Sequence, residues 1–205
     1  KRNRTFYYWH VHVKDVGPGQ LYAYRVFGPM QPELGLRFDS SKVLLDPYTR
    51  AVTSSTYQRR PAILAGDNCP FAMRGVVVDH HAYDWEGDVP LQRPFAGSVI
   101  YEMHVGGFTR HPSSGVAPER RGTYLGLIEK IPYLKDLGVN AVELMPLQEF
   151  NPDEITAINP VTGERLSNYW GYNTIAFFAP HEGYGTRLFP GCQIDEFKTM
   201  VKALH

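Results

Sequence analysis

The order strand, helix, strand between residues 99 and 147 constrains the fold of this chain more than any other feature of its sequence. Residues 99–105, VIYEMHV, are β-branched and aromatic, and residues 139–147 form a second, more continuously apolar run. Residues 124–137 lie between them and carry apolar side chains at helical spacing. Strands joined in this way are parallel and covered by helices. The sequence therefore predicts an α/β unit in this part of the chain.

The helix expected at 124–137 contains Pro132, which we expect either to split it or to start its second half. Gly138 follows where a C-terminal cap belongs. A final helix is predicted at 194–204. Its apolar face consists of Ile194, Phe197, Val201 and Leu204.

The first 84 residues show the pattern of short strands. Residues 5–13, TFYYWHVHV, alternate between two faces, and residues 21–28 alternate again after a Gly-Pro-Gly turn. We expect these two strands to form a hairpin, with a further short strand at 75–79. Together they predict a small antiparallel β-sandwich over residues 1–84.

Residues 85–98 separate the two patterns and form a linker, because two prolines, two glycines and several charges fit a connector better than a regular element. Residues 99–205 are too few for a (β/α)8 barrel, which takes about 250 residues and seldom fewer than about 200. If the strand, helix, strand order opens such a barrel, only about two of its βα units are present.

The charge balance argues against several partners. Lys plus Arg and Asp plus Glu number 21 each, so no basic field would attract nucleic acid or an anionic membrane. No apolar run approaches the roughly 20 residues of a membrane span, and the first residues show no secretory signal, so a cytoplasmic location is expected. The two cysteines cannot build a disulfide framework.

Histidines could bind a metal at two places in the sequence. His10 and His12 share a face of a predicted strand, and His80 and His81 are adjacent. No cysteine or carboxylate lies at ligand spacing, and zinc sites usually use three or four protein ligands. We therefore expect no metal and no other cofactor.

The segment 168–180, NYWGYNTIAFFAP, displays three aromatic residues in a glycine-containing loop shortly after the second apolar strand. Flat aromatic faces at the C-terminal end of a strand suit the flat apolar face of a sugar ring. Tyr169, Trp170 and Tyr172 therefore point to a carbohydrate ligand, although any of them could instead fill the core beneath the loop.

Three segments carry a family resemblance. YEMHVGGFT at 101–109, residues 121–150 and residues 168–180 resemble the start of the barrel in glycogen debranching enzymes and isoamylases of the α-amylase superfamily. FYYWHVHV, GQLYAYRVFGP and KVLLDPY resemble the β-sandwich carbohydrate-binding module that precedes that barrel. The resemblance implies retaining hydrolysis of α-1,6 branch points in glycogen, amylopectin or limit dextrins. Branching enzyme and maltooligosyl trehalose hydrolase share the architecture and stay as alternatives.

The resemblance also implies which residues bind and which are absent. Tyr172 matches the family tyrosine that stacks on the sugar before the cleaved bond, Trp170 and Tyr169 are further candidates, and Asn173 could donate to a hydroxyl. The family's catalytic carboxylates belong to later strands, so no residue here is expected to be catalytic. This chain is therefore interpreted as an inactive N-terminal fragment of a glycosidase, or alternatively as a stand-alone, non-catalytic glucan-binding protein.

Other carboxylates and glycines have plainer interpretations. Glu102 and Glu143 lie in the two predicted strands and Glu149 follows the second. The first two are expected to be buried carboxylates paired with Arg, His or backbone N–H groups, because a buried charge must be paired. The pairs Gly106-Gly107 and Gly183-Gly185 lack phosphate-loop spacing and are predicted to form turns.

Overall fold

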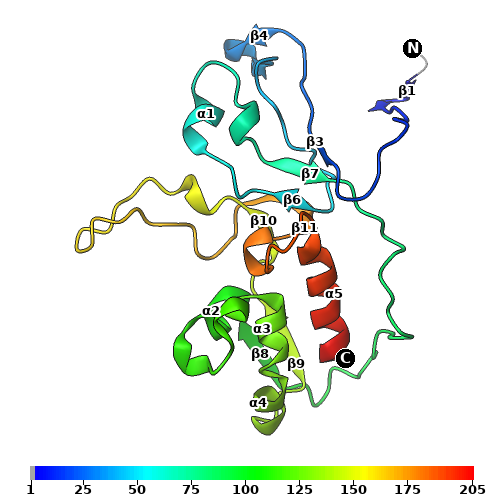
Figure 1. Cartoon of the computed structure of the whole chain (residues 1–205), viewed down its shortest axis with the longest axis vertical. Helices are drawn as coiled ribbons and strands as arrows, with labels where there is room; N and C mark the ends of the chain where they lie inside the picture. The colour runs from blue at the N-terminus through cyan, green and yellow to red at the C-terminus, as the bar shows by residue number, and fades with distance from the viewer. Residues whose placement is uncertain (1–2) are drawn as a thin grey trace.

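The computed structural model describes residues 3–205, with a β-rich N-terminal half and an α/β C-terminal half joined by a long connector (Figure 1). The strands of the N-terminal half are β1 (Arg4–Thr5), β2 (Tyr8–Trp9), β3 (Leu21–Tyr22), β4 (Met30–Gln31), β5 (Leu36–Arg37), β6 (Val52–Thr53) and β7 (Arg74–Val76), with one short helix, α1 (Arg59–Ile63). The C-terminal half contains β8 (Ile100–Met103), α2 (Val105–Arg110), α3 (Tyr124–Ile128), α4 (Ile131–Asp136), β9 (Ala141–Leu144), β10 (Gln148–Phe150), β11 (Thr174–Pro180) and α5 (Cys192–Leu204).

The N-terminal half is antiparallel, as predicted, but its pairing differs from the expected hairpin. Strand β3 pairs with β7 and β7 pairs with β6, whereas β1 and β2 pair only with each other among residues 3–205. The hairpin predicted between 5–13 and 21–28 is therefore wrong. The physical reason is a reversal at Phe6, whose positive φ of 56° folds the first strand back before its alternation can meet a neighbour.

The strand, helix, strand prediction is confirmed in the C-terminal half. Strands β8 and β9 are parallel, with Glu102 opposite Glu143, and helices α2 to α4 connect them. Pro132 divides the expected helix, because α3 ends before it and α4 begins at Ile131 with the proline in its first turn. The apolar run after β9 does not stay one strand, since β10 leaves β9 and pairs antiparallel with β11.

Helix α5 is also confirmed, although its buried stripe is more polar than expected. Phe197, Val201 and Leu204 pack against the core of the C-terminal half, while Gln193 and Glu196 are buried with it. Both polar side chains have partners: Gln193 donates to the Val52 carbonyl and Glu196 accepts the Thr186 N–H. Hydrogen bonding makes their burial tolerable.

A second apolar cluster joins the two halves. Val52 and Met73 of the N-terminal half pack with Ala176 and Ala179 of β11. Beside this cluster, the N–H and the hydroxyl of Ser54 both donate to the Glu182 carboxylate at 2.7 Å. The halves therefore share buried surface as well as a connector.

The connector contains no helix or strand between β7 and β8 in the described chain. It runs beside α5, where the Tyr83 hydroxyl lies 3.1 Å from the Thr199 hydroxyl and Lys202 pairs with Glu86 at 2.8 Å. These contacts fasten the connector, whose path Figure 1 shows, to the surface of the C-terminal half.

Candidate functional site

The aromatic loop, residues 168–173, is held at the C-terminal end of β8 by Tyr169. The Tyr169 ring stacks on His104, the residue after β8, with ring centroids 4.1 Å apart and planes 7° apart. The His104 Nε2 lies 2.7 Å from the Tyr169 carbonyl oxygen. Tyr169 thus anchors the loop to the strand end.

His104 is held in one tautomer by its neighbours. The Gly107 N–H donates to Nδ1 at 2.9 Å, so Nε2 carries the proton that is donated to Tyr169. Burial lowers the pKa of His104, and the charge of Arg110 acts in the same direction. The neutral imidazole is therefore the form that caps α2 and fixes the loop.

The glycine pair Gly106-Gly107 lies inside α2, so its prediction as a turn is wrong. The missing Cβ of Gly107 makes room for the Tyr169 hydroxyl, because a Cβ built there would overlap that oxygen. The close approach of this distant side chain, rather than a turn, requires glycine at position 107.

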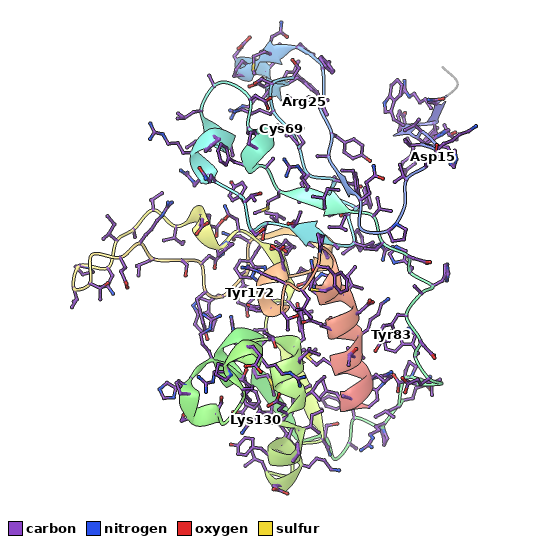
Figure 2. All side chains as sticks on the ribbon, in the orientation of Figure 1. Asp15, Arg25, Cys69, Tyr83, Lys130 and Tyr172 are labelled. Carbon is purple, nitrogen blue, oxygen red and sulfur yellow. The ribbon has the colours of Figure 1, made fainter. Side chains whose placement is uncertain are left out.

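Trp170 and Tyr172 are the most exposed aromatic residues of the loop, whose third aromatic residue, Tyr169, is 42% exposed. Trp170 is 56% exposed and Tyr172 is 66% exposed, and Tyr172 is labelled in Figure 2. The Trp170 ring meets Tyr169 edge to face at 5.6 Å. Tyr172 therefore does not fill the core beneath the loop, and both side chains are accessible to a ligand.

Asn173 has a partner that sequence reasoning missed. Its amide nitrogen donates to Oε1 of Glu154 at 2.6 Å, and the amide of Asn168 donates to the same oxygen at 2.7 Å. The Asn173 amide group, which was expected to donate to a sugar hydroxyl, thus already donates one hydrogen bond to Glu154. No spacing signal could have found this contact, because Glu154 precedes Asn168 by a 14-residue excursion.

Behind the loop lies a buried polar network. Glu149 is fully buried, and its two oxygens lie 2.6 Å from His181 Nδ1 and 2.8 Å from the Glu182 N–H. The Tyr184 hydroxyl lies 3.0 Å from His104 Nε2, and burial raises the pKa of Tyr184 to about 12. Glu149 therefore has the paired environment that a buried carboxylate needs.

The burial expected for Glu102 and Glu143 is wrong. Both carboxylates are exposed on the face of β8 and β9 that the helices leave uncovered. Their placement follows the alternation of the strands, since Met103 and Leu144 take the opposite, helix-covered face.

Within residues 3–205, no group of three or more His, Cys, Asp or Glu side chains gathers in a way that could hold a metal ion. His10 instead lies 2.8 Å from the Thr5 hydroxyl. Among the same residues, no helix is long and apolar enough to cross a membrane.

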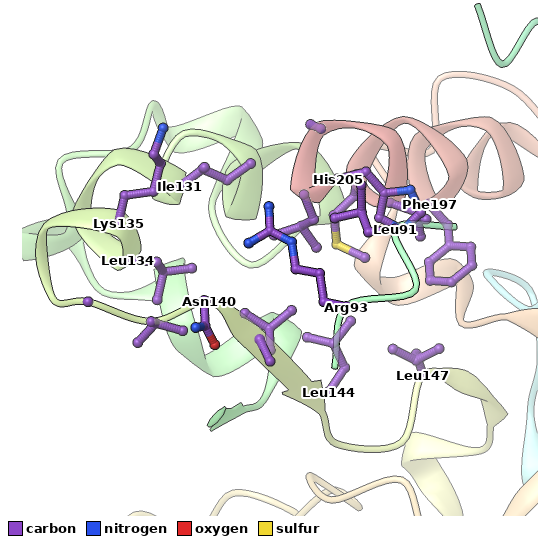
Figure 3. Close-up of a pocket in the computed structure, with 18 of the residues that line it drawn as sticks. Leu91, Arg93, Ile131, Leu134, Lys135, Asn140, Leu144, Leu147, Phe197 and His205 are labelled. Atoms are coloured by element: carbon purple, nitrogen blue, oxygen red, sulfur yellow. The ribbon is translucent and has the colours of Figure 1, made fainter. Parts of the chain in front are cut away.

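A cavity of about 930 Å³ lies away from the aromatic loop, between β9, α4 and α5 (Figure 3). Its wall is mainly apolar and includes Leu134, Leu144, Leu147, Phe197 and Met200. Leu91 and Arg93 of the connector also line it. The cavity borders the edge of β9 that has no partner strand in the described chain.

Comparisons with known proteins agree with the resemblance found in the sequence. Residues 1–49 match the model of carbohydrate-binding module 48, the isoamylase N-terminal domain. The whole chain is 44% identical to the chloroplastic isoamylase 1 of Arabidopsis thaliana, and 99% of it is 43% identical to that of Oryza sativa subsp. japonica. The chain spans about a quarter of these relatives, 26% and 25% of their lengths.

Solved structures give the same result. A putative alpha amylase from Salmonella typhimurium matches 94% of this chain with a TM-score of 0.57 and 28% identity, over 23% of its own length. Pullulanase type I from Bacillus subtilis matches 80% of this chain with a TM-score of 0.54 and 31% identity, over 21% of its own length. The resemblance to isoamylases and their superfamily is thus confirmed.

Proposed function

We propose that this chain is the amino-terminal part of an isoamylase-type glycoside hydrolase, which cleaves α-1,6 branch points of glycogen or amylopectin, and that it supplies glucan-binding elements. The similarity to isoamylases along the whole chain supports the reaction class. The match of residues 1–49 to a carbohydrate-binding module supports a glucan ligand.

The observation that carries the binding role is the exposed aromatic loop at the end of β8. Trp170 and Tyr172 present accessible rings, while Tyr169 and His104 hold the loop in place. Aromatic rings on a fixed support bind sugars by covering the apolar ring face without losing much side-chain freedom. We assign the glucan contact to Tyr172 and Trp170, and the support to Tyr169 and Asn173.

Catalysis is assigned to a part of the protein outside these residues. A retaining glycosidase needs two carboxyl groups about 5 to 5.5 Å apart beside an open site. The buried carboxylates Glu149, Glu182 and Glu196 each accept hydrogen bonds from neighbouring groups, so their oxygens serve the fold. The described chain is therefore expected to bind without hydrolysing.

The fold proposal is that β8 and β9 open a (β/α)8 barrel and that residues 1–84 form the preceding sandwich-type module, with 85–98 as linker. The unpaired edge of β9 and the apolar cavity under α5 support it, because a further parallel strand would fill both (Figure 3). An apolar cavity beside an unpaired strand edge needs another element to pack over it. The cytoplasmic location stays a prediction.

The test is a pair of assays on amylopectin with the 205-residue chain. Incubation followed by measurement of new reducing ends should show no hydrolysis, while amylopectin pull-down should retain the protein. Release of linear chains would contradict the absence of catalytic residues. Failure of the wild-type protein to bind amylopectin would contradict the glucan-binding role. Equal binding by Tyr172→Ala and the wild type would contradict the assignment of the contact to Tyr172.

The second candidate is a stand-alone glucan-binding protein, which the match of residues 1–49 to a carbohydrate-binding module also fits. The two candidates differ in what a longer protein would do. Extension of the chain to the full length of the isoamylase relatives should give debranching activity only if the first proposal holds.

A further inference from the structure

Glu154 joins the two ends of the aromatic loop. It ends the 3-10 turn Pro152–Glu154, which opens the excursion between β10 and β11. Its Oε1 accepts the side-chain amides of Asn168 and Asn173, the residues that flank the exposed rings. A single carboxylate oxygen therefore closes the base of the loop.

Other contacts hold both sides of the base of the loop. The Asn168 N–H donates to the Pro152 carbonyl at 2.8 Å, and the Asn168 side-chain oxygen accepts the Gly171 N–H at 3.1 Å. Gly171 has a left-handed φ of 77°, and a Cβ built on it would lie 3.0 Å from the Phe150 ring. On the other side, Thr174 pairs with Phe150 in the β10–β11 ladder, and the Asn173 side chain donates its hydrogen bond to Glu154.

The Glu154 closure acts together with the stack of Tyr169 on His104 to place the exposed rings. No side-chain hydrogen bond to Trp170 or Tyr172 occurs in residues 3–205, and Tyr172 has no aromatic partner there. Hydrogen bonds to an ionised acceptor are about twice as strong as those between neutral groups. One carboxylate oxygen can therefore hold both amides in place. The rings are thus placed by the residues on either side of them.

We propose that Glu154 is a positioning residue for the glucan-binding loop and acts through Asn168 and Asn173 rather than by touching the sugar. This inference rests on the proposed function of Trp170 and Tyr172.

Replacement of Glu154 by glutamine and by alanine separates positioning from direct binding. Glutamine keeps an oxygen that accepts both amides, whereas alanine removes it. A carboxylate that bound a sugar hydroxyl through its charge would lose affinity in both variants. Glu164→Ala is the matched control, because it removes an exposed carboxylate from the same excursion whose oxygens accept no hydrogen bond in the described structure.

The experiment uses Trp170 as reporter in the 205-residue chain carrying Trp9→Phe and Trp85→Phe. Acrylamide quenching without ligand measures loop order, and titration with maltoheptaose measures affinity. Glu154→Ala should increase the quenching constant and weaken maltoheptaose binding by about tenfold, the loss expected for hydrogen bonds to a charged group. Glu154→Gln should stay within about threefold of the parent, and Glu164→Ala should leave both values unchanged.

Asn173→Ala provides a second, surface variant should Glu154→Ala fail to fold. It should increase quenching in the same direction, and the double variant should be no worse than Glu154→Ala, because the two residues act as a unit. Equal quenching in Glu154→Ala and Glu164→Ala would overturn the positioning role, as would equal damage by Gln and Ala at position 154. If the parent fails to bind maltoheptaose, the proposed function fails, while the quenching comparison still decides the role of Glu154.

Discussion

Replacing Gly107 with alanine tests whether Tyr169 anchors the aromatic loop. In an ordinary helix this change is stabilising by about 0.5–1 kcal/mol, since glycine is the poorer helix former. Here the new methyl group would overlap the Tyr169 hydroxyl, so the ring must leave its place on His104. Displacement of the Tyr169 ring would remove its stack on His104, worth about 0.5–1.5 kcal/mol. It would also break the hydrogen bond between His104 Nε2 and the Tyr169 backbone carbonyl, worth about 1 kcal/mol.

The sum of these opposing effects is a net destabilisation of roughly 1 kcal/mol for Gly107→Ala. Tyr169→Phe removes the overlapping oxygen and leaves the ring carbon Cζ at 3.4 Å from the built Cβ, an ordinary contact. In that background, Gly107→Ala should therefore become stabilising. Urea unfolding of the four proteins gives the coupling free energy, which should be about 1.5–2.5 kcal/mol. If Gly107→Ala has the same effect with tyrosine and with phenylalanine at position 169, the anchoring argument is refuted.

Three further predictions follow from the same site. Glu149→Ala should lower the free energy of unfolding by about 3–5 kcal/mol, because it leaves His181 and a backbone N–H unpaired in the interior, and thermal and urea unfolding would show it. Tyr172→Ala should weaken maltoheptaose binding by about threefold to tenfold without changing the melting temperature, since its ring is exposed; a large loss of stability would contradict its assignment to the ligand. The depressed pKa of His104 means that protonation favours the unfolded chain, so its contribution is complete above the unfolded-state pKa of about 6.5 and is lost as pH falls toward the lower folded-state pKa. NMR titration should find His104 below the usual range, and unfolding of a His104→Gln variant should show a weaker pH dependence between these two values.

The parts of the fold that follow from the sequence are those with a long, regular pattern. The apolar strands at 99–105 and 139–147, the helix broken at Pro132 and the final helix each carry enough periodic residues to fix type and approximate position. The strand predicted at 5–13 was not found as expected, because a local reversal at Phe6 outweighs the alternation of the residues after it. The spacing of hydrophobic residues does not predict a local backbone reversal of this kind.

The candidate site was predicted in part. Exposure of Trp170 and Tyr172 agrees with the aromatic loop recognised in the sequence, although the assignment of a sugar to them stays a prediction. The roles of Gly107 and Glu154 could not be foreseen, since each depends on a residue far away in the chain: the Tyr169 hydroxyl for one and two asparagine amides for the other. Contacts across loops are set by tertiary structure, which residue spacing does not encode.

The apolar cluster between the two halves makes the β-rich half a structural support of the α/β half. Removing residues 1–84 would uncover Ala176 and Ala179, deprive the buried Gln193 amide of the Val52 carbonyl and leave the Glu182 carboxylate without Ser54. The strand β11 that follows the aromatic loop would then lose its backing. Loss of the first half in evolution would therefore require new packing for β11, the strand to which the aromatic loop is attached.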